Sequence, residues 1–460
     1  MAKKTEHNAD LATRLVDRHF GSSDGQLMVG QCPIGDIVAQ HGTPLYVYDK
    51  QVLSKKLEAL QAALSPRFDI FYSMKANPNQ EILRFFIDRQ CGIEIASTGE
   101  LHQALHAGCS PKSILFAGPG KRDEELAFAL QEAIGEIHVE SLAEARRLSE
   151  LAGQLQRRAQ VSLRINPSED AQGGAMRMGG KAAPFGIDEE RLDEVVDAVA
   201  ADPNLDLVGI HLFTGTQILD YQILGVQYRH AVSIARRVAD RLGRPLKTID
   251  FGGGLGIPYF AHEEPLDLEA FSREVAELIT EVDADPRLAG ARLIVEPGRF
   301  LVGEAGLYVS RIVEIKESRG KKFLIVDGGM HHHLAASGNL GQTIKRNYPV
   351  AIVNKLAAAD VESSNAEAPI EKVDVVGPLC TPLDVLARGV ELPLAEVGDL
   401  VAVFQSGAYG RTASPLGFLS HDGPAEVLVD GDAQYEIRRR GTVADLLADQ
   451  PVIQTEGATL

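Results

Sequence analysis

The sequence predicts an α/β protein with a (β/α)8 barrel of the TIM type and a second, β-rich domain of sandwich or barrel form. Between about residues 69 and 296, short apolar runs alternate with longer segments of helix-forming composition, as in repeated βα units with a parallel sheet. Eight such units in about 230 residues match the usual size of a closed barrel. Beyond Arg299 the sequence changes to strand-like segments separated by glycine.

The barrel strands are expected in chain order, each followed by a helix such as the one predicted over Leu142–Arg158. The eight strands are Asp69–Met74, Gly92–Ala96, Ser113–Ala117, Glu136–Val139, Val161–Asn166, Leu207–Phe213, Thr248–Phe251 and Arg292–Val295. A barrel of this type carries its chemistry on the loops at the carboxyl ends of its strands, so candidate site residues are sought there.

The β-rich domain is expected to combine segments from both sides of the barrel. Its predicted strands are Leu45–Tyr48, Leu307–Lys316, Lys322–Val326, Val373–Val376, Leu400–Phe404 and Ala425–Val429. We therefore place the barrel at residues 48–305 and the β domain at residues 1–47 together with 306–460. Residues 357–368 are expected to form a solvated loop, and the last dozen residues a loose tail.

Composition disfavours several classes of protein. The chain has 460 residues, with 46 Lys and Arg against 64 Asp and Glu, and its net charge of −18 disfavours nucleic acid as a partner. No run reaches the ~20 apolar residues of a membrane span and no signal-peptide core lies near the start, so we expect a cytoplasmic protein. The four cysteines lack metal-like spacing and are expected as reduced thiols.

Three motifs at predicted strand ends could carry chemistry. Lys75 closes the first strand, where desolvation would lower the pKa of its amine and make it a nucleophile toward aldehydes, although a lone lysine there more often only reaches solvent. Gly252–Gly254 follows the seventh strand, and its main-chain N–H groups could close on a phosphate or simply form a turn.

The third motif, Glu296-Pro297-Gly298-Arg299, closes the eighth strand with a carboxylate and a guanidinium. These two groups could bind a ligand or could simply pair with each other. A carboxylate facing a pyridine nitrogen keeps that nitrogen protonated and makes the ring a strong electron sink, which loss of CO2 from Cα demands. By contrast, the run His331-His332-His333 predicts no metal site, because adjacent residues of an extended segment point to alternating faces. His211, inside the sixth strand, is expected to be structural.

Together these motifs resemble the fold-type III pyridoxal-phosphate decarboxylases of the diaminopimelate and ornithine decarboxylase family. The resemblance runs from Thr43-Pro44-Leu45-Tyr46-Val47-Tyr48-Asp49 to Ser406-Gly407-Ala408-Tyr409, over most of the chain. It implies a pyridoxal 5'-phosphate cofactor bound by the lysine of the Lys75-Ala76-Asn77 motif. The cofactor-binding residues that it implies are Lys75, Glu94, Arg164, Phe213, Thr216, Gly252, Gly253, Gly254, Glu296, Arg299 and Tyr409.

The resemblance also implies a homodimer in which the segment Gly377-Pro378-Leu379-Cys380-Thr381-Pro382-Leu383-Asp384 reaches the active site of the neighbouring subunit. Cys380 then matches a cysteine thought to help return a proton to Cα, with an inert buried thiol as the alternative. Lys75, Glu296 and Cys380 are the expected catalytic residues. Arg299, Thr381 and Asp384 are the expected substrate residues.

Two departures from the family pattern bear on the substrate. Phe213 occupies the position of the histidine that stacks on the cofactor ring, and an aromatic face can still stack there. Thr381 occupies the position of the acidic residue that reads the distal amino group of diaminopimelate or ornithine. Because an unpaired buried charge costs several kcal/mol, dibasic substrates are disfavoured.

The sequence around Cys380 and His331 resembles a subgroup with decarboxylases of glutamate tethered to an acyl carrier protein and relatives near exopolysaccharide or exosortase loci. We therefore predict α-decarboxylation of a small or carrier-tethered amino acid. Diaminopimelate decarboxylation remains an alternative, and so does a non-catalytic homologue that acts through a partner protein. Racemisation is disfavoured, because barrel racemases place an arginine where this chain has Glu296.

Overall fold

The computed structural model describes residues 8–168, 176–177, 182–342, 345–356 and 369–451, and these divide into two compact units, residues 52–304 and residues 1–51 with 305–460. The loop predicted at residues 357–368 lies outside the described residues, as does most of the predicted tail. Among the residues described, no helix is both long enough and apolar enough to cross a membrane.

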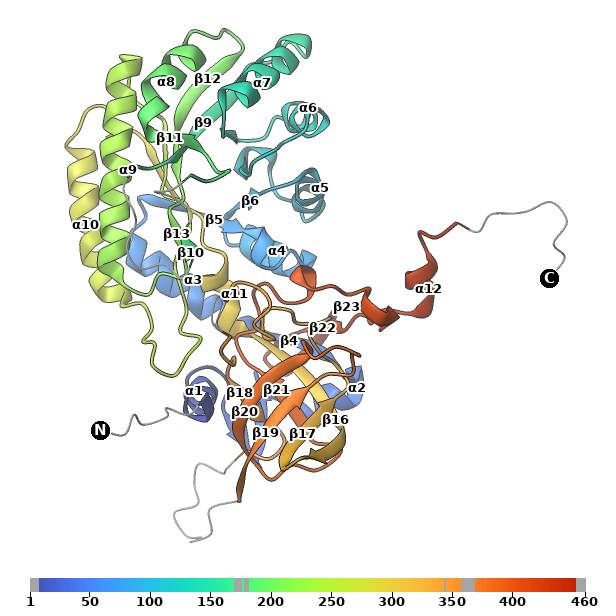
Figure 1. Ribbon diagram of the computed structural model, residues 1–460. Coiled ribbons are helices and arrows are strands. Elements are labelled where there is room, and N and C mark those ends of the chain that lie inside the picture. The colour runs from blue at the N-terminus through green and yellow to red at the C-terminus, as the bar shows by residue number, and fades with distance from the viewer. Residues whose placement is uncertain (1–7, 169–175, 178–181, 343–344, 357–368, 452–460) are drawn as a thin grey trace, which may run out of the picture. The chain divides into compact units, whose positions relative to one another are not determined.

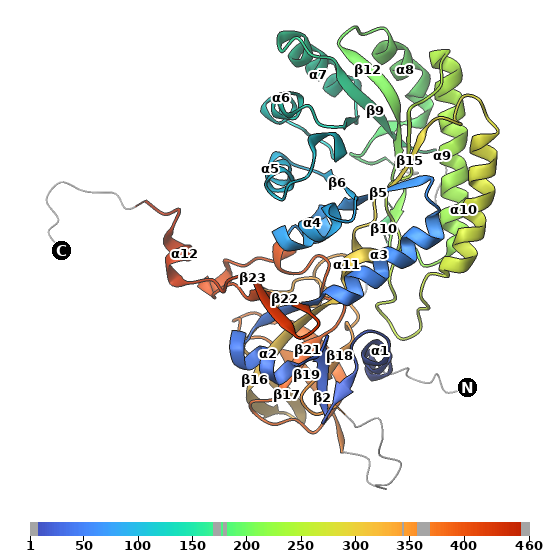
Figure 2. The same cartoon turned by 180° about the vertical axis from the view of Figure 1, so that it is seen from behind.

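The first unit is a closed barrel of eight parallel strands surrounded by helices, which confirms the predicted fold class (Figures 1 and 2). The strands are β5 (Phe68–Ser73), β6 (Gly92–Ile95), β7 (Ile114–Phe116), β8 (Glu136–Val139), β9 (Ala159–Asn166), β12 (Leu205–Leu212), β14 (Thr248–Asp250) and β15 (Arg292–Val295). Each strand pairs with the next in this order, and β15 pairs with β5 to close the barrel.

The barrel helices begin with side-chain caps that suit their sequence. The helices are α3 (Lys50–Leu64), α4 (Gln80–Ile87), α5 (Thr98–His106), α6 (Asp123–Glu132), α7 (Leu142–Gln154), α8 (Leu192–Ala200), α9 (Tyr221–Leu242), α10 (Leu268–Asp283) and α11 (Arg299–Val302). Five of them start after an Asn, Ser or Asp whose side chain accepts a main-chain N–H, namely Asn79, Ser97, Ser141, Asp220 and Asp267. These caps fix where the loops before these five helices end.

The strand interiors explain why the barrel holds its shape. Most barrel strand residues are fully buried apolar side chains, as expected for parallel strands covered on both faces. A small number of buried polar side chains interrupt this pattern, including Glu136, which accepts hydrogen bonds from the Ser162 and Thr248 hydroxyls at 2.6 Å. Short pairings flank the barrel: β11 (Ile187–Asp188) adds to β9, while β10 (Met176–Arg177) pairs with β13 (Gly215–Thr216).

The second unit is β-rich. Its main sheet runs in the order β20 (Val385–Pro393), β19 (Ile370–Val376), β17 (Lys321–Val326), β16 (Gly306–Ser318), β4 (Leu45–Asp49), β22 (Ala425–Asp430) and β23 (Ala433–Arg438). The long strand β16 also pairs with β21 (Leu400–Val403), which pairs with β18 (Val350–Ile352). Strand β4 precedes the barrel in the chain yet lies between β16 and β22.

The remaining elements of this unit are short. They include α1 (Asn8–Leu15), α2 (Ile34–His41), α12 (Val443–Leu447) and the small sheet of β1 (Ser22–Ser23), β2 (Gln26–Val29) and β3 (Cys32–Pro33). Large buried aromatic side chains from two of the paired strands, Tyr46, Tyr48 and Tyr308, form part of the core. The Tyr46 and Tyr308 rings lie 5.0 Å apart.

Candidate active site

Neighbouring strands of the barrel carry the predicted site residues to one end. Gly252–Gly254 follows β14, Glu296 follows β15, Lys75 follows β5 and Glu94 lies in β6. These four strands are consecutive neighbours in the barrel sheet, with β14 beside β15, β15 beside β5, and β5 beside β6. Residues more than 200 positions apart in the sequence therefore converge at the carboxyl ends of adjacent strands.

Lys75 lies in a single turn of 3-10 helix, Met74–Ala76, that continues β5. Its Nζ contacts both oxygens of Glu94, at 3.1 and 3.3 Å, and its side chain is 44% exposed while Glu94 is buried. The Ser73 hydroxyl donates a further hydrogen bond to Glu94. The buried carboxylate thus fixes the position of the amine while leaving it accessible to a ligand.

Glu100, at the start of α5, is a nearby carboxyl group that sequence reasoning missed. It accepts the Ala96 N–H at 2.6 Å, and burial raises its pKa to about 7 against the opposing effect of that hydrogen bond. The Glu94 carboxylate also raises this pKa, whereas Lys75 lowers it. A carboxyl group that titrates near neutrality beside the Lys75–Glu94 pair could exchange protons there.

The glycine turn after β14 leaves no room for side chains. A Cβ atom on Gly252 would lie 2.3 Å from the Leu212 carbonyl oxygen, and one on Gly253 would lie 2.4 Å from that of Glu296. Gly252 also has φ +67°, and Gly254 has φ +107°, so both adopt conformations that favour glycine. The Asp250 carboxylate accepts the Gly252 N–H at 2.8 Å and thereby fixes the first residue of the turn.

Phe213 lies beside this turn. A Cβ on Gly252 would come within 3.2 Å of the Phe213 Cβ, and one on Gly253 within 3.8 Å of its ring. Thr216, in β13, is adjacent to Gly215, whose carbonyl oxygen would lie 2.9 Å from a Cβ on Gly254. The structure thus brings two of the predicted cofactor residues, Phe213 and Thr216, to the glycine turn.

Glu296 belongs to a buried group of four side chains inside the barrel, called here the quartet: His138 from β8, His211 from β12, Asp250 from β14, and Glu296. One donor atom of each lies within 4.8 Å of the others. His211 Nε2 lies 3.1 Å from Glu296 Oε2, and the His138 and His211 rings stack at 4.4 Å. His138 and Asp250 were not predicted as site residues, and His211 was expected to be structural.

Arg164, in β9, is paired at close range with a carboxylate that sequence reasoning also missed. Its Nη1 lies 2.6 Å from Glu140 Oε1, and both side chains are buried. The other Glu140 oxygen accepts the Gly186 N–H at 3.0 Å, and the Arg164 guanidinium lies 5.2 Å from the Phe185 ring centre. Arg299 donates instead to the Tyr259 hydroxyl at 2.8 Å.

The other predicted site residues belong to the β unit. Cys380 is exposed and Tyr409 is half-buried with φ +53°. The Thr381 hydroxyl accepts the Leu383 N–H at 3.3 Å. Asp384 is 2% exposed, and its two oxygens accept the N–H groups of Met330 at 2.6 Å and Leu379 at 2.8 Å. Its carboxylate therefore joins two loops of this unit.

The run His331–His333 departs from the extended conformation assumed in the sequence analysis. The segment forms a turn in which the N–H groups of His332 and His333 both bond to the Gly329 carbonyl oxygen. All three rings are buried, so the argument from alternating faces was wrong. His332 contacts the Asp422 carbonyl oxygen and the Tyr308 hydroxyl, and His333 contacts Ser406, contacts that give these two rings structural roles.

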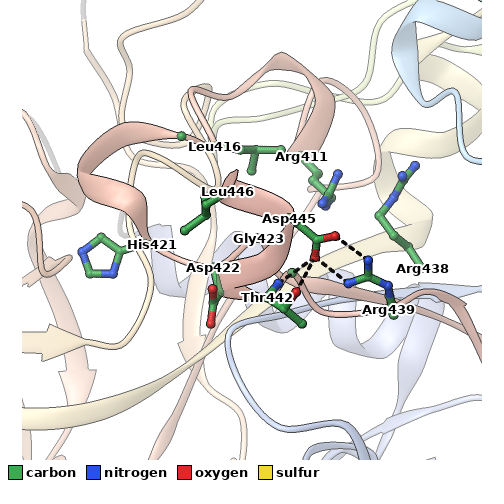
Figure 3. Close-up of a pocket in the computed structure, with 12 residues that line it drawn as sticks. Arg411, Leu416, His421, Asp422, Gly423, Arg438, Arg439, Thr442, Asp445 and Leu446 are labelled. Carbon is green, nitrogen blue, oxygen red and sulfur yellow. Dashed lines mark hydrogen bonds and ion pairs between the residues drawn. The ribbon is translucent and has the colours of Figure 1, made fainter. Parts of the chain in front are cut away.

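The β unit also contains a cavity of about 380 Å3 that the sequence did not indicate (Figure 3). None of the predicted site residues lines it. Arg411, Arg438 and Arg439 contribute to its wall, and Asp445 holds Arg439 through two contacts of 2.5 and 2.6 Å while also accepting from Thr442. Arg438 pairs with Glu426 and Arg439 with Asp445, so two of the three arginines already have a carboxylate partner and the cavity does not by itself indicate a ligand.

The barrel residues fit a pyridoxal phosphate group by two independent tests. Glu296 Oε1 is buried and has no hydrogen-bond partner among the described residues, so an acceptor remains for a protonated ring nitrogen. The glycine turn lets main-chain N–H groups approach a phosphate more closely than any side chain would allow. An amine, a carboxylate with one available oxygen and a glycine cradle are thus provided by neighbouring strand ends.

Comparison with known proteins agrees with a pyridoxal phosphate site made of these residues. Residues 50–303 match the profile of the family described as "Pyridoxal-dependent decarboxylase, pyridoxal binding domain". The chain belongs to this family. The chain is 39% identical over 430 residues to the L-glutamyl-[BtrI acyl-carrier protein] decarboxylase of Niallia circulans, and the aligned residues cover 94% of this chain and 98% of the relative.

Other relatives of the decarboxylase include diaminopimelate decarboxylases. That of Zymomonas mobilis is 33% identical, with 95% of this chain and 99% of the relative covered. The crystal structure of diaminopimelate decarboxylase from M. jannaschii superposes with a TM-score of 0.86 at 26% identity, covering 96% of this chain and 99% of that one. These matches confirm the predicted family, the two-part fold and the class of pyridoxal-dependent carboxy-lyases.

Proposed function

We propose that this decarboxylase removes CO2 from Cα of a glutamyl group carried by an acyl carrier protein. The observation that carries the proposal is the state of the segment Gly377–Asp384. Its only carboxylate is Asp384, and both oxygens of that carboxylate already accept main-chain N–H groups. A substrate with a distal ammonium group would therefore lack a partner in this segment, whereas a carrier-bound glutamyl group has no such ammonium.

The similarity to known proteins supports the same choice. Identity to the glutamyl carrier-protein decarboxylase is 39%, against 33% for the diaminopimelate decarboxylase of Z. mobilis over a similar length. Thr381 stands where the diaminopimelate enzymes carry an acidic residue, by the resemblance described above.

Within the barrel we propose that Lys75 binds the cofactor through its amine and that Glu94 positions this amine before binding. When bound, pyridoxal phosphate supplies a protonated ring that accepts the electron pair left by the departing CO2. Glu296 holds the ring nitrogen in its protonated form through its free Oε1, and the Gly252–Gly254 turn binds the phosphate. The supporting cofactor contacts are Arg164, Phe213, Thr216, Arg299 and Tyr409.

We also propose a cytoplasmic homodimer in which the segment Gly377–Asp384 of one subunit completes the site of the other. Cys380, which is exposed, then has access to Cα and returns a proton to it after CO2 leaves.

The experiment is CO2 release by cofactor-loaded protein from a panel of substrates. The panel holds glutamyl-loaded carrier protein and free glutamate, diaminopimelate, ornithine, lysine and arginine, with Lys75→Ala as the inactive control. We expect release from the carrier-bound glutamyl group alone. The variant Thr381→Glu, which restores the missing carboxylate, should gain activity toward diaminopimelate. Release from diaminopimelate by the unmodified protein would contradict the proposed substrate.

Two other functions stay open to the same experiment. Diaminopimelate decarboxylation is favoured by the high TM-score and by the number of similar enzymes with that name. A non-catalytic homologue would bind pyridoxal phosphate, visible as a Lys75-dependent absorbance band, yet release no CO2 from any member of the panel.

A further inference from the structure

The quartet contains more ionisable groups than a buried site can keep charged. His138 and Asp250 are fully buried, His211 is 1% exposed and Glu296 is 6% exposed. Oxygens of the two carboxyl groups lie within 4.8 Å of each other. Two carboxylates at this separation in a dry interior repel strongly, so one of them should hold a proton.

The hydrogen-bond pattern decides which carboxyl group is protonated. Glu296 Oε2 lies 3.1 Å from His211 Nε2, and its Oε1 receives no donor from the residues that the structure describes, so with the imidazole proton on Nε2 Glu296 is the acceptor. Asp250 is arranged differently. Its Oδ1 accepts the Gly252 N–H, and its Oδ2 lies 3.8 Å from His138 Nε2. Its carboxyl group also lies within hydrogen-bonding reach of the Glu296 carboxyl group, a contact that requires a proton on one of the two.

His138 has the matching deficiency. Neither of its ring nitrogens has a hydrogen-bond partner among the described residues, although one faces Asp250 at 3.8 Å and the other faces Glu296 at 4.0 Å. A single bridging water or a small ring rotation can close gaps of this length. A neutral imidazole has one donor and one acceptor, so it can accept a proton shared by Asp250 and donate toward Glu296.

We propose that Asp250 carries a proton in the folded protein and that His138 and Asp250 act as positioning residues, so that Glu296 bears the single negative charge of the quartet. The assignment gives the two imidazoles and Asp250 no net charge. It also orients the free Glu296 oxygen by fixing its other oxygen on His211. The role toward the cofactor rests on the proposed function, but the protonation of Asp250 does not.

The electrostatics point the same way. Burial and the neighbouring Glu296 carboxylate raise the pKa of Asp250 well above its ordinary value. Burial lowers the pKa of His211 to about 3 and that of His138 well below its ordinary value, so both rings are neutral near pH 7. The cations Lys121 and Arg164 act on His138 from a distance, and each already has a buried carboxylate partner.

The competing interpretation of the same four residues is a divalent metal ion held by two imidazoles and two carboxylates. That interpretation requires both carboxyl groups to be ionised, because a proton on Asp250 would occupy a ligand oxygen. It would also remove Glu296 from any contact with a ring nitrogen. The two interpretations therefore predict opposite protonation states for Asp250.

The test is infrared spectroscopy of the cofactor-free protein labelled with 13C at the aspartate side-chain carboxyl. We expect a carboxylic-acid carbonyl band at pH 7 that disappears in Asp250→Asn and persists in Asp384→Asn, the matched variant at another buried aspartate. Absence of an Asp250-dependent band would overturn the proposal, as would a stoichiometric metal ion in the purified protein. Because no cofactor is present, this readout does not depend on the proposed function.

A second measurement tests the consequence for Glu296. Asp250→Asn replaces a neutral acid with a neutral amide, so the affinity for pyridoxal phosphate should change less than about threefold, whereas Glu296→Gln should weaken it about tenfold or more. His138→Asn should keep the affinity but shift the pH dependence of the bound cofactor's absorbance, which His138→Phe should shift further. An equal loss in Asp250→Asn and Glu296→Gln would overturn the assignment of the charge to Glu296.

Discussion

Replacing Arg164 should destabilise the barrel far more than removing an ordinary surface arginine. Arg164 and Glu140 meet at 2.6 Å with side chains that are 8% and 4% exposed. Arg164→Met leaves the Glu140 carboxylate buried without its cation, which typically costs about 3–5 kcal/mol of unfolding free energy. This loss of unfolding free energy should be measurable in the cofactor-free protein, because Arg164 and Glu140 both belong to the barrel.

Two further variants separate the lost pair from lost packing. In Arg164→Met/Glu140→Gln the residue at position 140 is neutral but can still accept the Gly186 N–H, so most of the loss should be recovered, leaving about 1 kcal/mol. The control is Arg191→Met, which breaks an exposed pair with Glu194 at 3.1 Å and should cost less than about 1 kcal/mol.

The assay is urea unfolding of the cofactor-free protein, followed by far-ultraviolet circular dichroism because the chain has no tryptophan. The midpoint and slope of the barrel transition give the free energies for the four proteins. The reasoning would be refuted if Arg164→Met cost no more than Arg191→Met. It would also be refuted if the double variant were as unstable as the single one, because the buried unpaired carboxylate would then not be the cause.

Three other results are expected. Gly253→Ala should abolish cofactor binding without unfolding the β unit, since the added Cβ would lie 2.4 Å from the Glu296 carbonyl oxygen; retained binding would contradict the close approach. Burial lowers the pKa of His331 to about 4, so the neutral ring stabilises the folded protein by up to about 3 kcal/mol above pH 6.5, and this stability is lost as the pH falls toward 4. The variant His331→Gln should therefore flatten the pH dependence of the free energy of urea unfolding. An unchanged pH dependence would contradict this. A thiol reagent at pH 8 should modify the exposed Cys380 rapidly and the buried Cys91 and Cys109 slowly, because burial raises the pKa of both buried thiols to about 12. The variant Cys380→Ser should lose the rapid phase of the reaction.

The barrel could be predicted because its strands are short apolar runs in an otherwise polar chain. Glu136–Val139 and Arg292–Val295 have the predicted bounds, and the others differ by one or two residues at their ends. The sixth strand begins at Leu205 rather than Leu207, because Leu205 and Asp206 already pair with Ala159 and Gln160 of β9. Parallel pairing then follows from the βα alternation, and with it the convergence of Lys75 and Glu296 at neighbouring strand ends.

The turn at His331–His333 could not be predicted from local sequence. Its conformation depends on Asp384, more than 50 positions later, whose carboxylate binds the Met330 N–H and lies where any Cβ on Gly329 would be. The amino-acid sequence alone gives no reason to expect a contact between these positions. The extended segment expected from the sequence is therefore a turn instead.

The quartet did leave a signal in the sequence. In a strand buried on both faces, polar residues are costly, yet Glu136 and His138 alternate in β8, His211 lies in β12 and Asp250 in β14. Side chains two positions apart in a strand share a face, so polar residues in several strands of one barrel tend to meet inside it. Of these residues only His211 was considered from the sequence, and it was expected to be structural. Considered together they predict a buried polar centre around Glu296.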